Sequence, residues 1–322
     1  MPKYWMISNR NVEGDGLGAD KDRLRYWTTD EEELTDFANW GKPLSVSAFK
    51  TQLLDATKDF PLISDPADHE KQKHVVLYIH GFNNTWDGAL VRYKEICETL
   101  FEGLDSLGIC ILFSWPSDGM ALHYLPDRSD AVATAQDLAD VLTLLYDHLE
   151  KQQLAAATDE TKACRAKLSI IAHSMGNFVL QKAMQVVWTR KNRPLLTSLF
   201  NQILMVAADV DNDLFSDGEA ITDSDGDAIA NLTYRISALF SGRDAALGLS
   251  AGMKHFGKRW LGRSGLDEVV GKPPDNVWDL DCTDFFAQLA SSEVHTAYFT
   301  QPPVLAVFRR ILIGIDREFI LG

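Results

Sequence analysis

A strand that turns into a helix at a serine is the feature that most constrains this chain. The apolar run at residues 168–171 leads directly into the sequence AHSMG at 172–176, and a helix-like stretch follows over 177–187. This order is that of a nucleophile elbow, in which a sharp turn exposes the serine hydroxyl above a sheet. Ala172 and Gly176, two positions either side of Ser174, are small enough to let strand and helix pass closely. The segment therefore predicts a strand–turn–helix unit with Ser174 at its turn.

Predicted strands and helices alternate along most of the 322 residues. Apolar runs that predict buried strands lie at residues 74–79, 109–113, 168–172, 203–207, 232–240 and 277–280. The helical patterns between and after them include 87–104, a helix capped by Ser129, and a closing amphipathic helix over 303–315. Strands that are apolar on both faces and separated by helices form parallel sheets covered on both sides. The sequence therefore predicts the α/β class, with a mainly parallel, doubly wound sheet flanked by helices.

Residues 1–72 do not follow this alternation. The acidic stretch within 17–66 predicts an N-terminal extension that packs on the core and can include a hairpin at the sheet edge. Residues 73–322 form the main domain, with two candidate cap insertions at 116–130 and 245–274. The second has apolar residues among glycines, which suits either a mobile cap over an acyl chain or a fixed insertion on the sheet.

Acyl transfer by a serine requires a base, an acid that orients the base, and donors for an oxyanion. In the α/β-hydrolase arrangement the chain order is serine, then acid, then histidine, each after a strand. Here Ser174 is followed by Asp244, after the strand over 232–240, and by His295, after the last strand. These three residues form the predicted triad. Asp209 follows the strand over 203–207 and is kept as the alternative acid.

Two backbone amides are predicted to form the oxyanion hole. Met175 follows the nucleophile at a helix N-terminus, where amides are unpaired and the dipole favours negative charge. The second amide is that of Phe82, in the turn that follows the first buried strand. Further candidates for the substrate pocket lie in the same turns and are His80, Asn83, His173 and Trp115.

Several motifs together resemble one known family. HGFNN at 80–84, SWPS at 114–117, AHSMGN at 172–177 and DVD at 209–211 occur in the order found in DUF900, a bacterial alpha/beta-hydrolase family within the esterase/lipase superfamily. Residues 241–247 resemble its acid-bearing segment and 295–299 its histidine segment. The resemblance covers roughly residues 75–299 and leaves the first seventy aside. It implies the α/β-hydrolase fold and hydrolase chemistry, without a defined substrate.

Composition narrows the class of partner. The formal net charge is −15, so the surface repels phosphate backbones and no nucleic-acid partner is expected. The four cysteines match no zinc or redox spacing, and neither a metal nor an organic cofactor is required. No basic and apolar leader opens the chain, and no apolar run approaches the roughly 20 residues that span a bilayer. We therefore expect a cytoplasmic protein without an integral membrane segment.

These observations predict a serine hydrolase that cleaves a small-molecule carboxylic ester through an acyl-enzyme. The same triad would serve a thioesterase, an amidase or an acyltransferase, because the fold hosts many reactions. Lipase-like action at a lipid interface is a further alternative. A non-catalytic ligand-binding protein that keeps the pocket is the alternative from another class. The sequence gives no signal for the oligomeric state.

Overall fold

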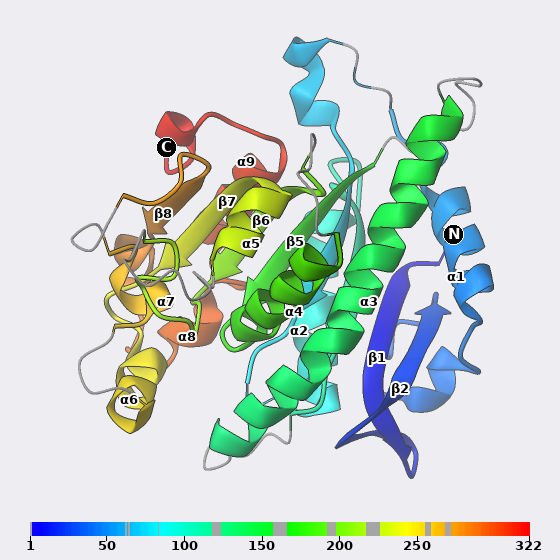
Figure 1. Ribbon diagram of the computed structural model, residues 1–322, viewed down its shortest axis with the longest axis horizontal. Coiled ribbons are helices and arrows are strands. Elements are labelled where there is room, and N and C mark those ends of the chain that lie inside the picture. Colours follow the sequence, from blue (N-terminus) through cyan, green and yellow to red (C-terminus); the bar gives the residue numbers. More distant parts are fainter. Residues whose placement is uncertain are drawn as a thin grey trace.

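Eight strands form a single sheet in the computed structural model, which describes residues 2–61, 63, 65–82, 84–117, 124–156, 166–191, 198–216, 226–254, 259–267 and 272–322 (Figure 1). The strands are β1 (Tyr4–Glu13), β2 (Gly16–Thr29), β3 (His74–Ile79), β4 (Gly108–Ser114), β5 (Lys167–His173), β6 (Phe200–Val206), β7 (Thr233–Phe240) and β8 (Val277–Asp281). Their spatial order is β2-β1-β4-β3-β5-β6-β7-β8. Only β2 runs antiparallel to its neighbour, so the sheet is mainly parallel, as predicted.

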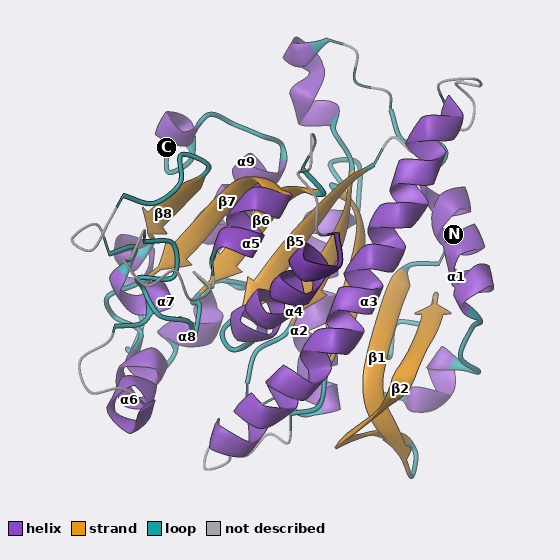
Figure 2. Ribbon diagram, in the orientation of Figure 1, coloured by secondary structure: helices purple, strands orange, loops and turns teal. Residues whose placement is uncertain are grey.

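Helices cover both faces of the sheet (Figure 2). One face carries α1 (Val46–Thr57), α3 (Tyr124–Ala156), α4 (Gly176–Lys191) and α5 (Asp227–Leu232), the last three lying in front of the sheet in Figure 1. The opposite face carries α2 (Trp86–Ile96) and α9 (Pro302–Leu312). The remaining helices, α6 (Ala245–Lys254), α7 (Leu261–Ser264) and α8 (Val294–Ala297), follow β7 and β8 in the chain.

The strand β3 explains why the central strands have continuous apolar sequences. Val75, Leu77 and Ile79 belong to the core cluster on one face, and Val76 and Tyr78 belong to the cluster on the other. Since successive side chains of a strand point to opposite faces, a sheet covered on both sides needs apolar residues at every position. This pattern made the strand recognisable from sequence.

The N-terminal region contributes strands to the sheet. Its hairpin, β1 and β2, lies at one edge, and β1 pairs in parallel with β4 through partners that include Trp5 with Ile111 and Ile7 with Phe113. Residues 4–29 thus extend the main sheet (Figure 1).

Two predicted helix boundaries were wrong. Helix α3 begins at Tyr124, so Ser129 lies inside it and does not cap it. The helix predicted over 87–104 is α2 followed by a π-helical turn over Cys97–Phe101.

The two candidate cap insertions are only partly described. Of the first, 116–130, residues 118–123 lie outside the described residues, and its last part belongs to α3. The second, 245–274, includes α6 and α7, while 255–258 and 268–271 lie outside the described residues.

Candidate active site

Ser174 sits between β5 and α4 with a φ of 53°. This left-handed conformation is uncommon for a residue with a side chain and costs on the order of 1–3 kcal/mol. Backbone hydrogen bonds fix it, because the Ser174 amide donates to the Val206 carbonyl at 3.0 Å and the Ser174 carbonyl accepts from the Asp209 amide at 3.2 Å. The Asn177 side chain also donates to the Ser174 carbonyl, at 3.1 Å. The elbow is therefore held from β6 as well as from its own strand and helix.

Two glycines allow the elbow to pack against the end of β3. A Cβ atom added at Gly176 would lie 2.5 Å from the His80 carbonyl oxygen, and one added at Gly81 would lie 2.7 Å from Cβ of Ser174. Neither distance is compatible with a side chain. The turn after β3 can approach Ser174 this closely only because both positions lack one.

Ser174, His295 and Asp244 form one hydrogen-bonded row. Nε2 of His295 lies 2.9 Å from Oγ of Ser174, and Nδ1 of His295 lies 2.7 Å from Oδ2 of Asp244. Because a carboxylate only accepts, Nδ1 donates to Asp244 and Nε2 is left to accept from the serine hydroxyl. The side chain of Asp244 is fully buried, whereas that of His295 is 18% exposed. This arrangement can transfer a proton from the hydroxyl to the imidazole.

The Asp244 carboxylate is held in place at the start of α6. Its Oδ1 accepts from the Leu247 amide at 3.0 Å, which leaves Oδ2 for His295. The Arg263 guanidinium donates to the Asp244 carbonyl. These contacts come from α6 and α7, so the 245–274 segment supports the row directly.

The alternative acid, Asp209, occupies a different place. It is buried, and its amide donates to the Ser174 carbonyl. Nδ1 of His295 donates its hydrogen bond to Asp244 instead. Asp209 thus supports the backbone of the elbow.

His173 lies beside the row and positions His295. Its Nε2 donates to the His295 carbonyl at 2.9 Å, and the two imidazole centroids lie 4.9 Å apart. Burial, with a contribution from the neighbouring His295, holds the pKa of His173 well below its ordinary value. The ring is therefore neutral and acts as a donor to the backbone.

His80 and Trp115 were candidates for the substrate pocket, but both are fully buried. The Trp115 amide donates to Nε2 of His80 at 3.1 Å, its indole NH donates to the His80 carbonyl at 2.8 Å, and the two rings stack in near-parallel planes. Burial, with a smaller effect from the charge of Arg10, lowers the pKa of His80 to about 3. These two residues therefore join the turns after β3 and β4 from within and offer no surface to a substrate.

The peptide group between Gly81 and Phe82 is held in place through its carbonyl oxygen. The Gly81 carbonyl accepts from Nδ1 of His80 at 2.9 Å and from Nδ2 of Asn84 at 3.1 Å. Because carbonyl and amide point in opposite directions across a trans peptide, these bonds also set the direction of the Phe82 N–H. Asn84 belongs to the HGFNN motif but was not among the predicted site residues. The predicted pocket residue Asn83 lies outside the described residues.

The Met175 amide lies at the start of α4, immediately after Ser174. It donates no hydrogen bond to the rest of the described chain. An amide at a helix N-terminus is available to an anion.

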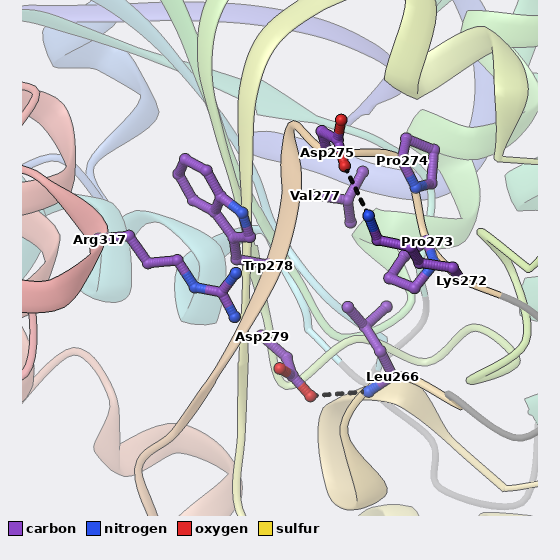
Figure 3. Close-up of a pocket in the computed structure, with 9 residues that line it drawn as sticks. All are labelled: Leu266, Lys272, Pro273, Pro274, Asp275, Val277, Trp278, Asp279 and Arg317. Atoms are coloured by element: carbon purple, nitrogen blue, oxygen red, sulfur yellow. Dashed lines mark hydrogen bonds and ion pairs between the residues drawn. The ribbon is translucent and has the colours of Figure 1, made fainter.

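A cavity of about 530 Å³ lies elsewhere, around the first residues of β8 (Figure 3). Trp278, Asp279 and Arg317 are among the residues that line it, and none of the three residues of the row is. Among the described residues, no three His, Cys, Asp or Glu side chains are placed to hold a metal ion. No helix in the described part of the chain has the length and apolar character needed to cross a bilayer.

Comparisons with known proteins show one family and several similar chains. Residues 62–314 match the model of a family described as "Alpha/beta hydrolase of unknown function (DUF900)". An uncharacterized protein from Nostoc sp. is 23% identical over 96% of this chain and 92% of its own. An esterase from Pyrobaculum calidifontis aligns with 84% of this chain and 94% of its own, at 11% identity and a TM-score of 0.36. A thermostable esterase from Pseudomonas putida aligns with 84% and 90%, at 13% identity and a TM-score of 0.34. The family match spans most of the chain, including all three residues of the row, and the chain belongs to the DUF900 family of alpha/beta hydrolases.

Proposed function

We propose that this protein is a serine hydrolase that cleaves carboxylic esters of small molecules. The observation that supports this most directly is the row from Oγ of Ser174 through the imidazole of His295 to the buried carboxylate of Asp244. Both distances fall in the range that proton transfer between a nucleophile and its base requires.

In the first half of the reaction, Nε2 of His295 takes the hydroxyl proton as Oγ of Ser174 bonds to the ester carbonyl carbon. Asp244 accepts from Nδ1 and stabilises the imidazolium that forms. The tetrahedral intermediate then breaks its bond to the alcohol oxygen, which receives the proton from Nε2. An acyl-enzyme on Ser174 and a free alcohol result.

In the second half, His295 takes a proton from water, and the hydroxide adds to the acyl carbon. Breakdown of this second intermediate returns the proton to Oγ of Ser174 and releases the carboxylic acid. In both halves the negative carbonyl oxygen is held by the amides of Met175 and Phe82. One such donor contributes about 2.7–4 kcal/mol of transition-state stabilisation.

The test combines covalent labelling with turnover. A fluorophosphonate probe should label Ser174 in the folded protein, and Ser174→Ala should abolish labelling without loss of fold. A chain-length series of p-nitrophenyl esters, run beside a thioester and an anilide of the same acyl group, should give the highest kcat/KM on the ester. Absence of both labelling and ester turnover above Ser174→Ala would overturn the proposal in favour of a binding protein. If the thioester or the anilide were turned over faster, that class of compound would replace the ester as the proposed substrate.

A further inference from the structure

Arg10 of β1 is a buried arginine, with only 1% of its surface exposed. Burying a guanidinium is costly unless carbonyls or other acceptors replace the water it loses. Four such acceptors lie between 2.9 and 3.0 Å from its nitrogens, and they are Oγ of Ser114 and the carbonyls of Gly18, Ser117 and Asn84. These partners come from β2, from the turn after β3, and from the last residue of β4 with the turn that follows it, so one side chain connects three separate segments.

The contact with Asn84 leads to the predicted oxyanion donor. Nη2 of Arg10 donates to the Asn84 carbonyl at 3.0 Å. The Asn84 side chain in turn donates to the carbonyls of Gly81 and Phe82, at 3.1 and 3.0 Å. The guanidinium thus anchors the residue that fixes the Gly81–Phe82 peptide.

The contacts with Ser114 and Ser117 fix the neighbouring turn in the same way. Nε donates to the Ser114 hydroxyl and Nη1 to the Ser117 carbonyl. The two turns also contact each other, because the Asn84 amide donates to Oγ of Ser117 at 3.3 Å. Displacement of the guanidinium would therefore release both turns at the point where they meet.

An arginine is suited to this position by its shape. Its planar guanidinium presents five N–H groups in fixed directions, whereas a lysine presents one nitrogen. A lysine at residue 10 would keep the charge, but it could not reach acceptors on both turns at once. The contacts of Arg10 therefore require its geometry as well as its charge.

We propose that Arg10 is a positioning residue that aligns the Phe82 amide for the oxyanion. The inference rests on the proposed esterase function. It also gives the N-terminal hairpin, which lies outside the family match over 62–314, an indirect part in catalysis through Asn84. When such a donor is displaced, the transition state is stabilised less, while substrate binding changes little.

The experiment compares Arg10→Met and Arg10→Lys with a control on the same hairpin, Arg25→Met. The Arg25 side chain is 12% exposed, and its described partners are Asp22 and the Arg10 carbonyl. On a p-nitrophenyl ester, both Arg10 variants should lose about 10- to 100-fold in kcat with KM within about threefold. Arg25→Met should stay within about threefold of wild type in both parameters.

A second measurement uses a trifluoromethyl ketone, which bonds to the serine and places an oxyanion in the hole. Its inhibition constant should rise in each Arg10 variant by the factor by which kcat/KM falls. Ser114→Ala keeps Arg10 and removes one acceptor, and it should show the same pattern at a few-fold amplitude. This milder variant keeps the test valid if an Arg10 variant does not fold.

Three results would overturn the inference. The first is an unchanged kcat in a folded Arg10 variant or in Ser114→Ala. The second is an equal loss of kcat in Arg25→Met. The third is a change in KM alone, with the inhibition constant of the ketone unchanged. Failure of the proposed function would look different, since the wild-type protein would then neither turn over the ester nor label at Ser174.

Discussion

Ser174 adopts a backbone conformation that few residues with a side chain tolerate, and its neighbours maintain it. The Val206 carbonyl, the Asp209 amide and the Asn177 side chain each hydrogen-bond to its backbone. Two aspartates that follow the adjacent strands β6 and β7 differ in their contacts. Asp209 meets the elbow through its amide, and Asp244 meets His295 through its carboxylate.

The two aspartates can be separated by substitution. Asp244→Asn should lower kcat by about 10³- to 10⁴-fold, because an amide at this position favours the wrong histidine tautomer. Asp209→Asn keeps the backbone contact to Ser174 and should cost less than about tenfold. Steady-state turnover of a p-nitrophenyl ester checks both, with near-ultraviolet circular dichroism as the control for folding. The opposite ranking would move the acid to Asp209.

At the scale of elements, the buried parallel strands were predictable and the first strand was not. Strand β3 is apolar at almost every position, because the sheet is covered on both sides. Strand β1 is buried from Tyr4 to Arg10, but Ser8, Asn9 and Arg10 lie in this buried part. The Asn9 amide nitrogen and the Arg10 guanidinium donate to partners far away in the chain, Asp137 and Ser114, and no local sequence pattern records those partners.

The residues of the candidate site that follow strands could be predicted from the sequence, because the parallel sheet itself brings them together. In a parallel sheet, residues that follow different strands gather at one edge, so the chain order predicted Ser174 and His295 together with an acid, and it left Asp244 and Asp209 as alternatives. The partners through which His80 and Trp115 brace the turns were not accessible. His80 and Trp115 lie in motif-like turns, but only the three-dimensional structure shows that their polar atoms face each other inside the protein.

The junction of α4 with the end of β3 gives a prediction at this scale. Gly176→Ala should destabilise the protein by about 1–3 kcal/mol, because its Cβ would meet the carbonyls of His80 and Ile79 at 2.5 and 2.7 Å. Gly88→Ala, in the first turn of α2, is the matched control. There the nearest atoms are 3.5 Å away, so alanine should be neutral or stabilise the protein by up to about 1 kcal/mol. Urea denaturation measures both, and equal stability of the two variants would contradict the close approach.

For the whole molecule, the sheet separates two core clusters and gathers the site at one edge. The elbow, the two turns and the Asp244 and His295 segments all follow the carboxyl ends of parallel strands. The same design buries polar groups in the centre of the sheet. Three histidines, His74, His80 and His173, lie on or directly after the two central strands β3 and β5, and all three are buried.

These buried histidines make the global stability depend on pH. Burial lowers the pKa of His74 from the ordinary 6.5 to about 4 and that of His80 to about 3, and it lowers the pKa of His173 as well. A histidine whose pKa is depressed by folding binds its proton in the unfolded chain first, so lowering the pH through 6.5 favours unfolding. Between pH 7.5 and 5.5 each group should remove about 1 kcal/mol from the free energy of unfolding, and the three together about 3–4 kcal/mol. Most carboxylates stay ionised over this interval, so urea denaturation at the two pH values isolates the histidines. The variant His74→Asn should reduce the difference by about one third, and a free energy of unfolding that is equal at pH 7.5 and 5.5 would show that these imidazoles are not held neutral by the fold.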